Sequence, residues 1–576
     1  MLMEITSLEG SQKAVIHESS IFSLHELNDQ KIIIQWDRCN KNNFSDETLK
    51  DLVRSFRKNK TLPLDHCLET GVYLFSLPDD GIILYSDPGI PTSLYYSVKG
   101  GTVYLANSDK KVSELISNSQ EIDYAGLYQR LVFGHTFGPR TRYKDVCVLE
   151  PGSTVFIDFN GNIQRKYLYY EHIRTTLQDI WEALREEIGK IRDEKIGIML
   201  SAGYDSRVLL AACMEQKIRI DLAYTHGLIG SNELNIAYEL AKIAGTRTVV
   251  HMDAGSGMFG GAEELHAFFN DIGMLYQVFW RLAGKYFAAE GVTPICGIQA
   301  EILNGQFMNG LLMSSLPRMK KYVISNSGYS TYINSSKRFS DFFLNSVSAG
   351  FLNFIRSNLK GKFKEAREVT RHDLQSLAES YHSVCDNWDD IVIRFLSDHD
   401  GSKLMAQQAR ILQRFCHVST PFTSRKVYML CKNYPAKDKL YGKAMRKLIC
   451  KYSPRLSKYQ CTKSNLPVFF PDVAHLVGRA IRSYFDDDKI IRFLKSRGKK
   501  RRYLEKLSWI GGDVWIREGN SLEEILKLVT WDILDPKITN DFINKISNYT
   551  VAVGDGNDLL RLIELELLYG KQQRFV

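Results

Sequence analysis

The chain has 576 residues, of which 44% are hydrophobic and 24% charged, and its formal net charge at pH 7 is +9. This composition is typical of a globular protein with sizeable cores, and a chain of this length divides into two or more domains. So modest a positive charge does not require a nucleic-acid partner, and we expect none. The basic cluster at 499–502 is either a solvated helix face or a contact to an anionic partner.

The ten cysteines are scattered, without Cys-x-x-Cys pairs or Cys/His clusters at the spacing of metal ligands. They indicate neither a disulfide framework nor a structural zinc site, and they fit a reducing cytoplasm. The first ten residues, MLMEITSLEG, lack the pattern of a signal peptide, and no stretch approaches the ~18 apolar residues that a membrane span needs. We therefore expect a cytoplasmic chain without a membrane span.

Short alternating runs of aromatic and β-branched residues between 71 and 170 predict antiparallel strands and hairpins, with an Asn-Gly turn at 160–161. Helical spacing at 51–58 and 123–132 makes this region mixed rather than all-β. The pattern changes near 175, and we place the domain boundary there. The expected domains are 1–172 and 173–576.

Helical and strand patterns alternate after the boundary: TTLQDIWEALREEIGKIRD, KIGIML, SRVLLAACMEQ, RIDLAYTHG, SNELNIAYELAKIAG and RTVVHMD. This alternation predicts an α/β domain with a parallel sheet covered on both faces. From about 262 onward helices predominate, interrupted by the short strand TPICGI. The segments at 521–534 and 558–570 are expected to be amphipathic helices that complete the domain.

The run IGIMLSAGYDSRVLLAA (196–212) places small and hydroxyl residues and one carboxylate between a buried strand and a helix. In a parallel sheet, such a turn presents free backbone N–H groups and the helix dipole to an anion. Asp205 would repel a bare phosphate, so it indicates a Mg²⁺ ion that accompanies the phosphate. The alternative is a structural turn in which the serines and Asp205 serve as caps.

Four motifs in order resemble the asparagine synthetase superfamily. SAGYDSR is similar to the Ser-Gly-Gly-x-Asp-Ser pyrophosphate loop (PP-loop) of adenylating ATP pyrophosphatases. It is followed by THGLIGSNELNIAYELAKIAGTRTVVHMD, by CGIQAEILNGQ and by a late segment that ends in QCTKSNLP. The resemblance extends over nearly the whole chain and implies a PP-loop synthetase domain with a helical C-terminal part.

The first domain resembles the N-terminal-nucleophile (Ntn) glutaminase domain of glutamine-dependent asparagine synthetases, which implies an α+β sandwich. That activity needs a cysteine as residue 2, whereas this chain has Leu2 and its first cysteine is Cys39. The resemblance therefore implies a degenerate glutaminase that does not hydrolyse glutamine. Such a chain is similar to β-lactam synthetases and lasso peptide cyclases, in which an amine on the substrate replaces ammonia.

The resemblance also implies the site. Lys463 would stabilise charge at the acyl centre, Glu301 matches the family glutamate, and Asp205 would bind Mg²⁺. Two departures concern the same site, because Ala202 occupies a glycine position and Ala300 stands where a metal-binding aspartate belongs. Glu301 either takes over as a ligand or pairs with a nearby basic residue. The expected ATP-binding residues are Leu200, Ser201, Ala202, Gly203, Tyr204, Asp205 and Ser206.

Four further residues leave alternatives open. We expect Glu233, in the first turn of its helix, to complement the helix dipole. Arg207 either contacts a phosphate or forms a salt bridge on its helix. Lys443 either neutralises phosphate charge or is exposed at the surface. His226 is expected near the adenine end of the cleft, without a catalytic role.

The expected function is an ATP-dependent amide ligase that adenylates a carboxylate of a small molecule or peptide, releases AMP and pyrophosphate, and works without glutamine. One form is a lasso peptide macrolactam synthetase, with a precursor peptide and its protease as partners. An alternative is an enzyme that amidates a sugar, a polysaccharide or an amino acid. Another alternative is an inactive binding or scaffold protein, since Leu2, Ala202 and Ala300 depart from the motifs.

Overall fold

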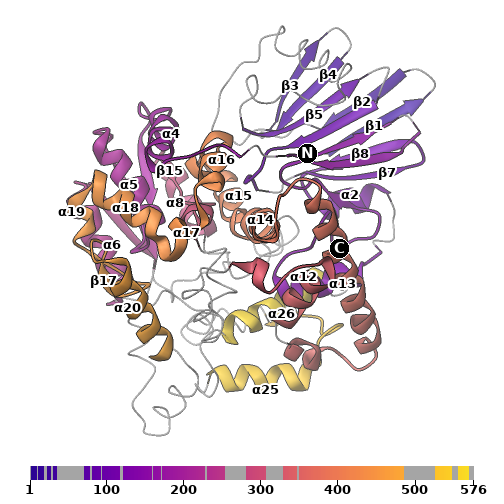
Figure 1. The fold of residues 1–576 in the computed structure, drawn as a ribbon. Coiled ribbons are helices and arrows are strands. Elements are labelled where there is room, and N and C mark those ends of the chain that lie inside the picture. Colours follow the sequence, from indigo (N-terminus) through magenta and orange to yellow (C-terminus); the bar gives the residue numbers. More distant parts are fainter. Residues whose placement is uncertain are drawn as a thin grey trace.

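The chain is a mixed α/β protein with both antiparallel and parallel sheets. In Figure 1 the antiparallel strands lie at the upper right, and the parallel strands lie among helices at the left. The computed structural model describes residues 2–8, 11–17, 22–27, 30–35, 70–77, 81–91, 94–116, 121–158, 160–169, 172–226, 230–252, 280–305, 328–346, 349–485, 526–527, 529–547 and 555–569.

Two antiparallel sheets are formed by the strands before residue 168. The five-stranded sheet has the order β2-β1-β8-β7-β9, and the six-stranded sheet has the order β11-β10-β6-β5-β4-β3. The strands are β1 (Leu2–Leu8), β2 (Ser11–His17), β3 (Phe22–Leu27), β4 (Gln30–Gln35), β5 (Val72–Leu77), β6 (Gly81–Ser86), β7 (Tyr95–Lys99), β8 (Thr102–Ala106), β9 (Cys147–Val148), β10 (Ser153–Ile157) and β11 (Ile163–Tyr167).

The two antiparallel sheets share one apolar core. Leu74 and Leu84 of the six-stranded sheet belong to the same buried cluster as Tyr96 and Leu105 of the five-stranded sheet. Along β10 buried and partly exposed residues alternate, because successive side chains of a strand point to opposite faces. The sheets therefore pack face to face as a sandwich.

The parallel sheet has the strand order β14-β13-β12-β15. Its strands are β12 (Ile196–Met199), β13 (Leu222–His226), β14 (Thr248–Met252) and β15 (Thr293–Ile295). Every residue of β12 is buried, as expected for a strand covered by helices on both faces. Glycine at 197 is required there, since a Cβ atom would lie 2.6 Å from the Phe287 ring.

Helices make up most of the rest of the described chain, and none of them combines the length and apolarity that crossing a bilayer requires. They are α2 (Asp109–Ile116), α3 (Tyr124–Phe133), α4 (Leu177–Gly189), α5 (Asp205–Glu215), α6 (Asn232–Ile243), α8 (Trp280–Ala289), α9 (Glu301–Asn304), α12 (Ser336–Ser346), α13 (Lys360–His382), α14 (Trp388–Leu396), the π-helix η4 (Ser397–Met405), α15 (Gln407–Gln413), α16 (Arg425–Asn433), α17 (Ala436–Lys439), α18 (Lys443–Tyr452), α19 (Pro454–Ser457), α20 (Asp472–Phe485), α25 (Pro536–Ser547) and α26 (Asp555–Tyr569).

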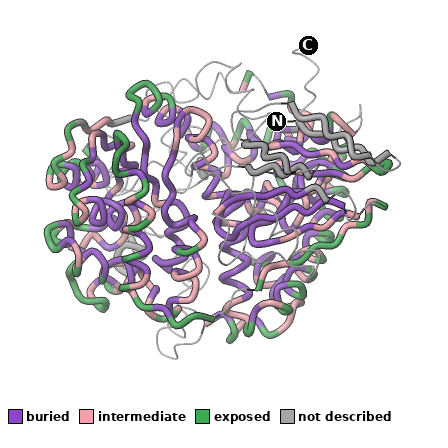
Figure 2. The backbone as a smooth tube through the Cα atoms, turned by 90° about the horizontal axis from the view of Figure 1, so that it is seen from above, coloured by how far each residue is buried: buried purple, intermediate pink, exposed green. Residues whose placement is uncertain are grey.

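Helices from the C-terminal half contact the first 170 residues. In Figure 1, α12 and α13 lie beneath the antiparallel strands. Phe363 of α13 makes an edge contact with Tyr124 of α3, and Arg130 of α3 pairs with Glu564 of α26 at 2.8 Å. Figure 2 shows buried backbone on both sides of the molecule and exposed residues at the outer turns.

The predicted α/β class is confirmed, as are the strands predicted at β5–β8, β10, β11 and β12–β15. The strands β1–β4 were not predicted. The helix predicted at 51–58 lies outside the described residues. The division predicted between 172 and 173 falls in the connection between β11 and α4.

The helix predicted at 521–534 is wrong for residues 529–534, which are irregular. The Glu566 carboxylate on α26 accepts the backbone N–H groups of Asp532 (3.1 Å) and Ile533 (2.7 Å). Leu534 forms a β-bridge with Ile355. These tertiary partners take up the backbone groups that a helix would have paired internally. By contrast, the helix predicted at 558–570 corresponds to α26.

A buried ion pair joins the antiparallel sandwich to α16. The Asp87 carboxylate is fully buried, and its two oxygens accept hydrogen bonds from Nε (2.6 Å) and Nη2 (2.8 Å) of Arg425. The Gly71 N–H and the Tyr85 hydroxyl each donate to the same carboxylate at 2.8 Å. All of its polar contacts are therefore made within the protein.

We expect Asp87→Asn to weaken the attachment of the sandwich to α16. Removing one charge of a buried pair leaves the other without a counter-charge and costs about 3–5 kcal/mol. A thermal unfolding scan should show the first transition at a lower temperature than in the wild type. Asp193→Asn, at an exposed position, is the control and should leave that transition in place.

Candidate functional site

The candidate site lies where the connections of the parallel sheet change direction. The chain passes from β12 through α5 to β13 on one side, while β15 pairs with β12 on the other side. The turns after β12 and β15 therefore leave the sheet side by side at its carboxyl edge. Crevices at such switch points are where open α/β sheets bind ligands.

The turn at 200–204 leads directly into α5. Leu200 is buried, and its N–H donates to the Tyr224 carbonyl of β13 at 2.9 Å, which continues the sheet. The Val208 N–H donates to the Tyr204 carbonyl at 2.9 Å. The N–H groups of Asp205, Ser206 and Arg207 precede it in the first turn, where a helix offers no carbonyl partner. They are the donors available to an anion at this end of α5.

Three N–H groups of the turn are occupied by the protein's own side chains. The Ser201 N–H donates to Ser206 Oγ (3.1 Å), and the Gly203 N–H donates to Ser201 Oγ (3.2 Å). The Ala202 N–H donates to Glu233 Oε1 at 2.8 Å. The turn is thus held by internal hydrogen bonds, and fewer of its backbone donors face a ligand than the sequence pattern implied.

The substitution of alanine for glycine at 202 is accommodated. Ala202 is fully buried, and it is not among the described residues with positive φ, so its methyl group causes no backbone strain. Tyr204 is buried as well, and its ring packs so closely on Gly442 that a Cβ there would lie 2.6 Å from the ring. The Tyr204 side chain therefore serves the core rather than the loop.

The turn after β15 brings a second carboxylate to the first. A Cβ atom on Gly297 would lie 3.1 Å from Cβ of Asp205, so glycine permits this close approach. Glu301 follows at the start of α9 and is 7% exposed. The Nδ2 atom of Asn304, one helical turn later, donates to Asp205 Oδ1 at 2.8 Å. Asn304 was not singled out in the sequence, although its i,i+3 spacing from Glu301 was visible there.

Each of the two carboxyl groups makes ionisation of the other less favourable. Loss of solvent and the nearby Asp205 raise the pKa of Glu301 to about 7. Loss of solvent also raises the pKa of Asp205, while Lys463 and the hydrogen bond from Asn304 oppose that rise. Glu301 Oε2 is buried without a hydrogen-bond partner among the described residues. No ion pair of the described residues includes Glu301, so the expected alternative of a basic partner is not found there. The pair therefore favours uptake of a proton or a cation.

Lys463 reaches this acidic pair from a distant part of the sequence. It is half-buried in the turn between β16 (Gln460–Cys461) and β17 (Leu466–Pro467), and its charge acts on both Asp205 and Glu301. The structure therefore brings Asp205, Glu301 and Lys463 together, as the resemblance implied.

Arg207 fixes the relative position of these segments. Its guanidinium is fully buried on α5 and donates to the carbonyls of Tyr459 (2.9 Å) and Gln460 (2.7 Å), just before Lys463. It also donates to the carbonyls of Leu456 (3.3 Å) and Ala202 (3.0 Å). Both roles considered for Arg207 from the sequence are wrong, since its described acceptors are backbone carbonyls.

The other residues considered from the sequence have different partners. Glu233 lies in the first turn of α6, as expected, but its carboxylate is buried and holds the Ala202 N–H. Lys443 is half-buried and pairs with Asp438 at 2.7 Å, so it is not simply exposed. His226 is partly buried at the end of β13, and its ring contacts the edge of Trp280.

The acidic pair also connects to the π-helix η4. Gln299, two residues before Glu301, has a backbone φ of 67°, a value that residues other than glycine rarely adopt. Its Nε2 donates to Ser402 Oγ of η4 at 2.9 Å. Lys403, the next residue of η4, donates to the carbonyls of Thr136 (3.1 Å) and Gly138 in the antiparallel part. η4 therefore contacts both parts of the molecule.

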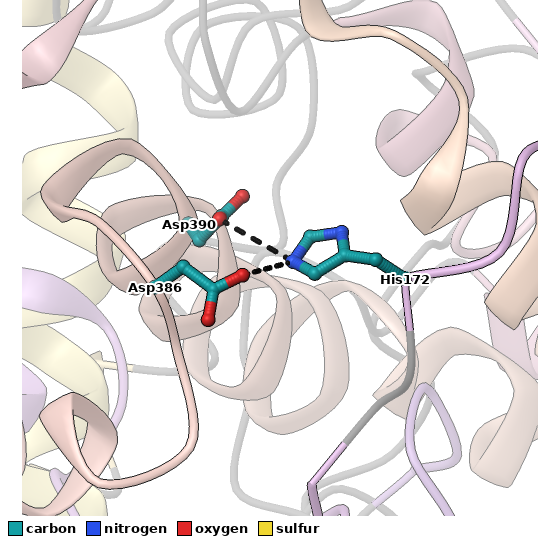
Figure 3. Close-up of side chains that lie close together, drawn as sticks. All are labelled: His172, Asp386 and Asp390. Carbon is teal, nitrogen blue, oxygen red and sulfur yellow. Dashed lines mark ion pairs between the residues drawn. The ribbon is translucent and has the colours of Figure 1, made fainter.

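A separate group of side chains of the kinds that can bind metals joins the connection before α4 to the start of α14. Figure 3 shows His172 beside Asp386 and Asp390, which flank the start of α14. His172 Nε2 is 2.8 Å from Asp386 Oδ2 and 3.9 Å from Asp390 Oδ2. His172 and Asp386 are more than half exposed, and exposed ion pairs contribute little stability. This group is best described as a surface contact that holds the connection against α14.

Comparisons with known proteins give no match, either among protein-family models or among curated proteins. A functional proposal for this chain therefore depends on the motifs of the sequence and on the geometry of the site.

We expect Arg207→Lys to destabilise the protein by about 2–4 kcal/mol, because one ammonium group cannot replace a planar guanidinium that serves four carbonyls. Urea unfolding monitored by circular dichroism measures the loss. Arg219→Lys is the matched control, since Arg219 is exposed and pairs with Asp221 at the surface. Equal stability of the two variants would contradict the role assigned to Arg207.

We expect Glu301 to make the stability of the metal-free chain depend on pH. Its pKa of about 7 lies above the ordinary value of ~4.3, so the folded state binds the proton more tightly than the unfolded state. Stability contributed by this group is thus lost as the pH rises from about 4.5 to about 7. Glu301→Gln should therefore melt at least about 2 °C above the wild type at pH 8, with little difference at pH 5.

Thermal scans at pH 5, 6, 7 and 8 without divalent cations measure this difference. Glu290→Gln, at an exposed position near β15, serves as the control. A constant offset between Glu301→Gln and the wild type across these pH values would show that Glu301 does not titrate in this range.

Proposed function

We propose that the chain is an ATP-dependent ligase that adenylates a substrate carboxylate and joins it to an amine. The observation that carries this proposal is the placement of Asp205, Glu301 and Lys463 around the first turn of α5, at the carboxyl edge of the parallel sheet. A helix N-terminus suits a phosphate group, but two carboxylates beside it would repel one. The combination makes sense when a divalent cation accompanies the phosphates.

The residues present fit Mg²⁺. Carboxylate oxygens are its preferred ligands, and Mg²⁺ commonly takes only one or two from the protein. Glu301 Oε2 is buried without a described partner, and Asn304 holds the Asp205 carboxylate from one side. We propose that Asp205 and Glu301 hold the ion together, so that Glu301 compensates for the absence of an aspartate at 300. When bound, Mg²⁺ would neutralise charge on the phosphates of ATP.

The chain's own groups would assist the departure of pyrophosphate. The carboxylate of the substrate attacks the α-phosphorus of ATP, and negative charge accumulates on the leaving pyrophosphate. The N–H groups of Asp205 and Ser206 would donate to it, and the Ser201 and Ser206 hydroxyls lie beside them. Donors fixed in place before the reaction lower such a barrier most effectively. Lys463 would stabilise charge at the acyl centre while the amine attacks the acyl-adenylate, so that the amide bond forms, the bond from the acyl carbon to AMP breaks, and AMP and a proton are released.

The domain assignments belong to the same proposal. The sandwich would be a degenerate Ntn-glutaminase-like domain, and residues 173–576 a PP-loop synthetase domain with a helical C-terminal part. One form of this chemistry is the closure of a peptide to a macrolactam, as in lasso peptide cyclases, with the precursor peptide and its protease as partners. Amidation of a sugar, a polysaccharide or an amino acid is the alternative acceptor chemistry.

One observation favours a binding protein without catalysis. The N–H groups of Ser201, Ala202 and Gly203 are held by side chains of the chain itself. If these hydrogen bonds persist with nucleotide present, the loop offers only the first turn of α5 to a phosphate. Such a protein would bind nucleotide weakly and would not exchange pyrophosphate into ATP.

Binding of α,β-methylene ATP tests the site without knowledge of the substrate. Isothermal titration should show binding to the wild type only with Mg²⁺, and at least about tenfold weaker binding to Asp205→Asn and Glu301→Gln. Lys463→Met should retain this binding and also ATP–pyrophosphate exchange with an accepted carboxylate, which reports adenylation, but it should lower formation of the amide product by about 100-fold. Lys458→Met, at an exposed position on the same segment, is the control.

Two results would count against the ligase. Binding that does not depend on Mg²⁺ or on Asp205 would remove the metal site. Magnesium-dependent binding without exchange, across a panel of peptide and small-molecule carboxylates, would favour the binding protein.

A further inference from the structure

A cavity of about 750 Å³ lies between the antiparallel part and α13. One wall is the segment from Phe137 to Glu150, which follows α3, together with Arg165, Lys166 and Tyr167 of β11. The opposite wall is the C-terminal half of α13 and the residues after it, including Leu377 and Val384. Its volume falls within the range of small-molecule sites. None of its lining residues belongs to the site around Asp205.

Three charged residues of the wall, Arg140, Asp123 and Asp373, form one ion-pair cluster with a formal net charge of −1. Arg140 donates from Nε (2.7 Å) and Nη2 (2.9 Å) to the Asp373 carboxylate of α13, and it also pairs with Asp123. This arrangement connects the two walls. It leaves Arg140 no surplus charge for a ligand.

Glu150 and Arg165 differ from that group, because no ion pair of the described residues includes either of them. Glu150 is 4% exposed and accepts a hydrogen bond from the Tyr167 hydroxyl at 2.8 Å. Arg165 is exposed and donates to two neutral groups, the Tyr96 hydroxyl (2.9 Å) and Cys147 Sγ (3.4 Å). One cavity thus presents a buried carboxylate and a guanidinium whose described hydrogen-bond partners are uncharged.

We propose that this cavity binds a free amino acid or a dipeptide in its zwitterionic form. Glu150 would accept hydrogen bonds from the ligand's ammonium group, and Arg165 would donate to its carboxylate. The apolar side chains of Phe137, Leu377 and Val384 line the same cavity and would contact the ligand's side chain. Recognition of both termini is what separates this ligand class from simple amines and simple acids.

The proposal is independent of the ligase reaction, and its test needs neither ATP nor Mg²⁺. Isothermal titration of the full chain measures binding of the twenty amino acids and of dipeptides such as Gly-Leu. We expect saturable binding of one equivalent of at least one of them. Its N-acetyl derivative lacks the ammonium charge and its C-terminal amide lacks the carboxylate. Each derivative should bind at least about tenfold more weakly than the free zwitterion, because hydrogen bonds between charged groups are the strong ones.

Two variants assign the ends of the ligand. Arg165→Gln should weaken binding of the zwitterion about tenfold, but it should not further weaken binding of the C-terminal amide. Glu150→Gln keeps an acceptor for the Tyr167 hydroxyl. This variant should weaken binding of the zwitterion, but it should not further weaken binding of the N-acetyl derivative. Arg174→Gln, at an exposed position outside the cavity, is the control. Circular dichroism confirms that each variant is folded.

The Asp205→Asn variant distinguishes this cavity from the site on α5, because amino-acid binding by that variant should equal binding by the wild type. Three results would overturn the proposal. They are no saturable binding up to about 10 mM, equal binding of zwitterion and blocked derivatives, and binding by Arg165→Gln equal to that of the control.

Discussion

The guanidinium of Arg207 holds together the parts of the candidate site. Asp205 comes from α5, whereas Lys463 comes more than 250 positions later, in the β16–β17 hairpin. Nothing in local backbone preference brings these segments together. A buried arginine that donates to carbonyls on both sides does so, since each carbonyl lost would be a buried acceptor without a donor. Arg207 therefore helps to place the segment that carries Lys463.

That dependence explains what the sequence could and could not predict about the site. The strand, the turn and the helix around Asp205 are local, and apolar periodicity with small residues between the runs was enough to predict them. Arg207 has the same sequence signature as a phosphate ligand or a partner in a surface ion pair. Its acceptors are backbone carbonyls, which every residue type supplies, so no sequence pattern could have predicted which residues accept these hydrogen bonds. The hydrogen bond from the Ala202 N–H to the Glu233 carboxylate likewise joins a side chain to a backbone group that is distant in the sequence.

The fold shows a similar division between local and distant causes. The runs that became β5 and β6 carry their own signal, because apolar, aromatic and β-branched residues occupy both faces of these short segments, and every residue of β6 is buried. The irregular backbone at 529–534 does not, since its sequence has helical spacing. Its conformation depends on distant partners, the Glu566 carboxylate and the β-bridge to Ile355. Apolar pattern therefore predicted elements well, and failed where a buried charge from elsewhere captured backbone N–H groups.

The π-helix η4 gives the interface between the two parts an unusual sensitivity to chain length. The Ala406 N–H donates to the Gly401 carbonyl five residues earlier, rather than four, so this stretch contains an additional residue in each turn. That wider winding directs Ser402 toward Gln299 and Lys403 toward Gly138. Deleting one residue between 397 and 401 would shift the register of η4 and turn Ser402 and Lys403 away from these partners. At η4, the contact between the two parts therefore depends on the exact length of one helix.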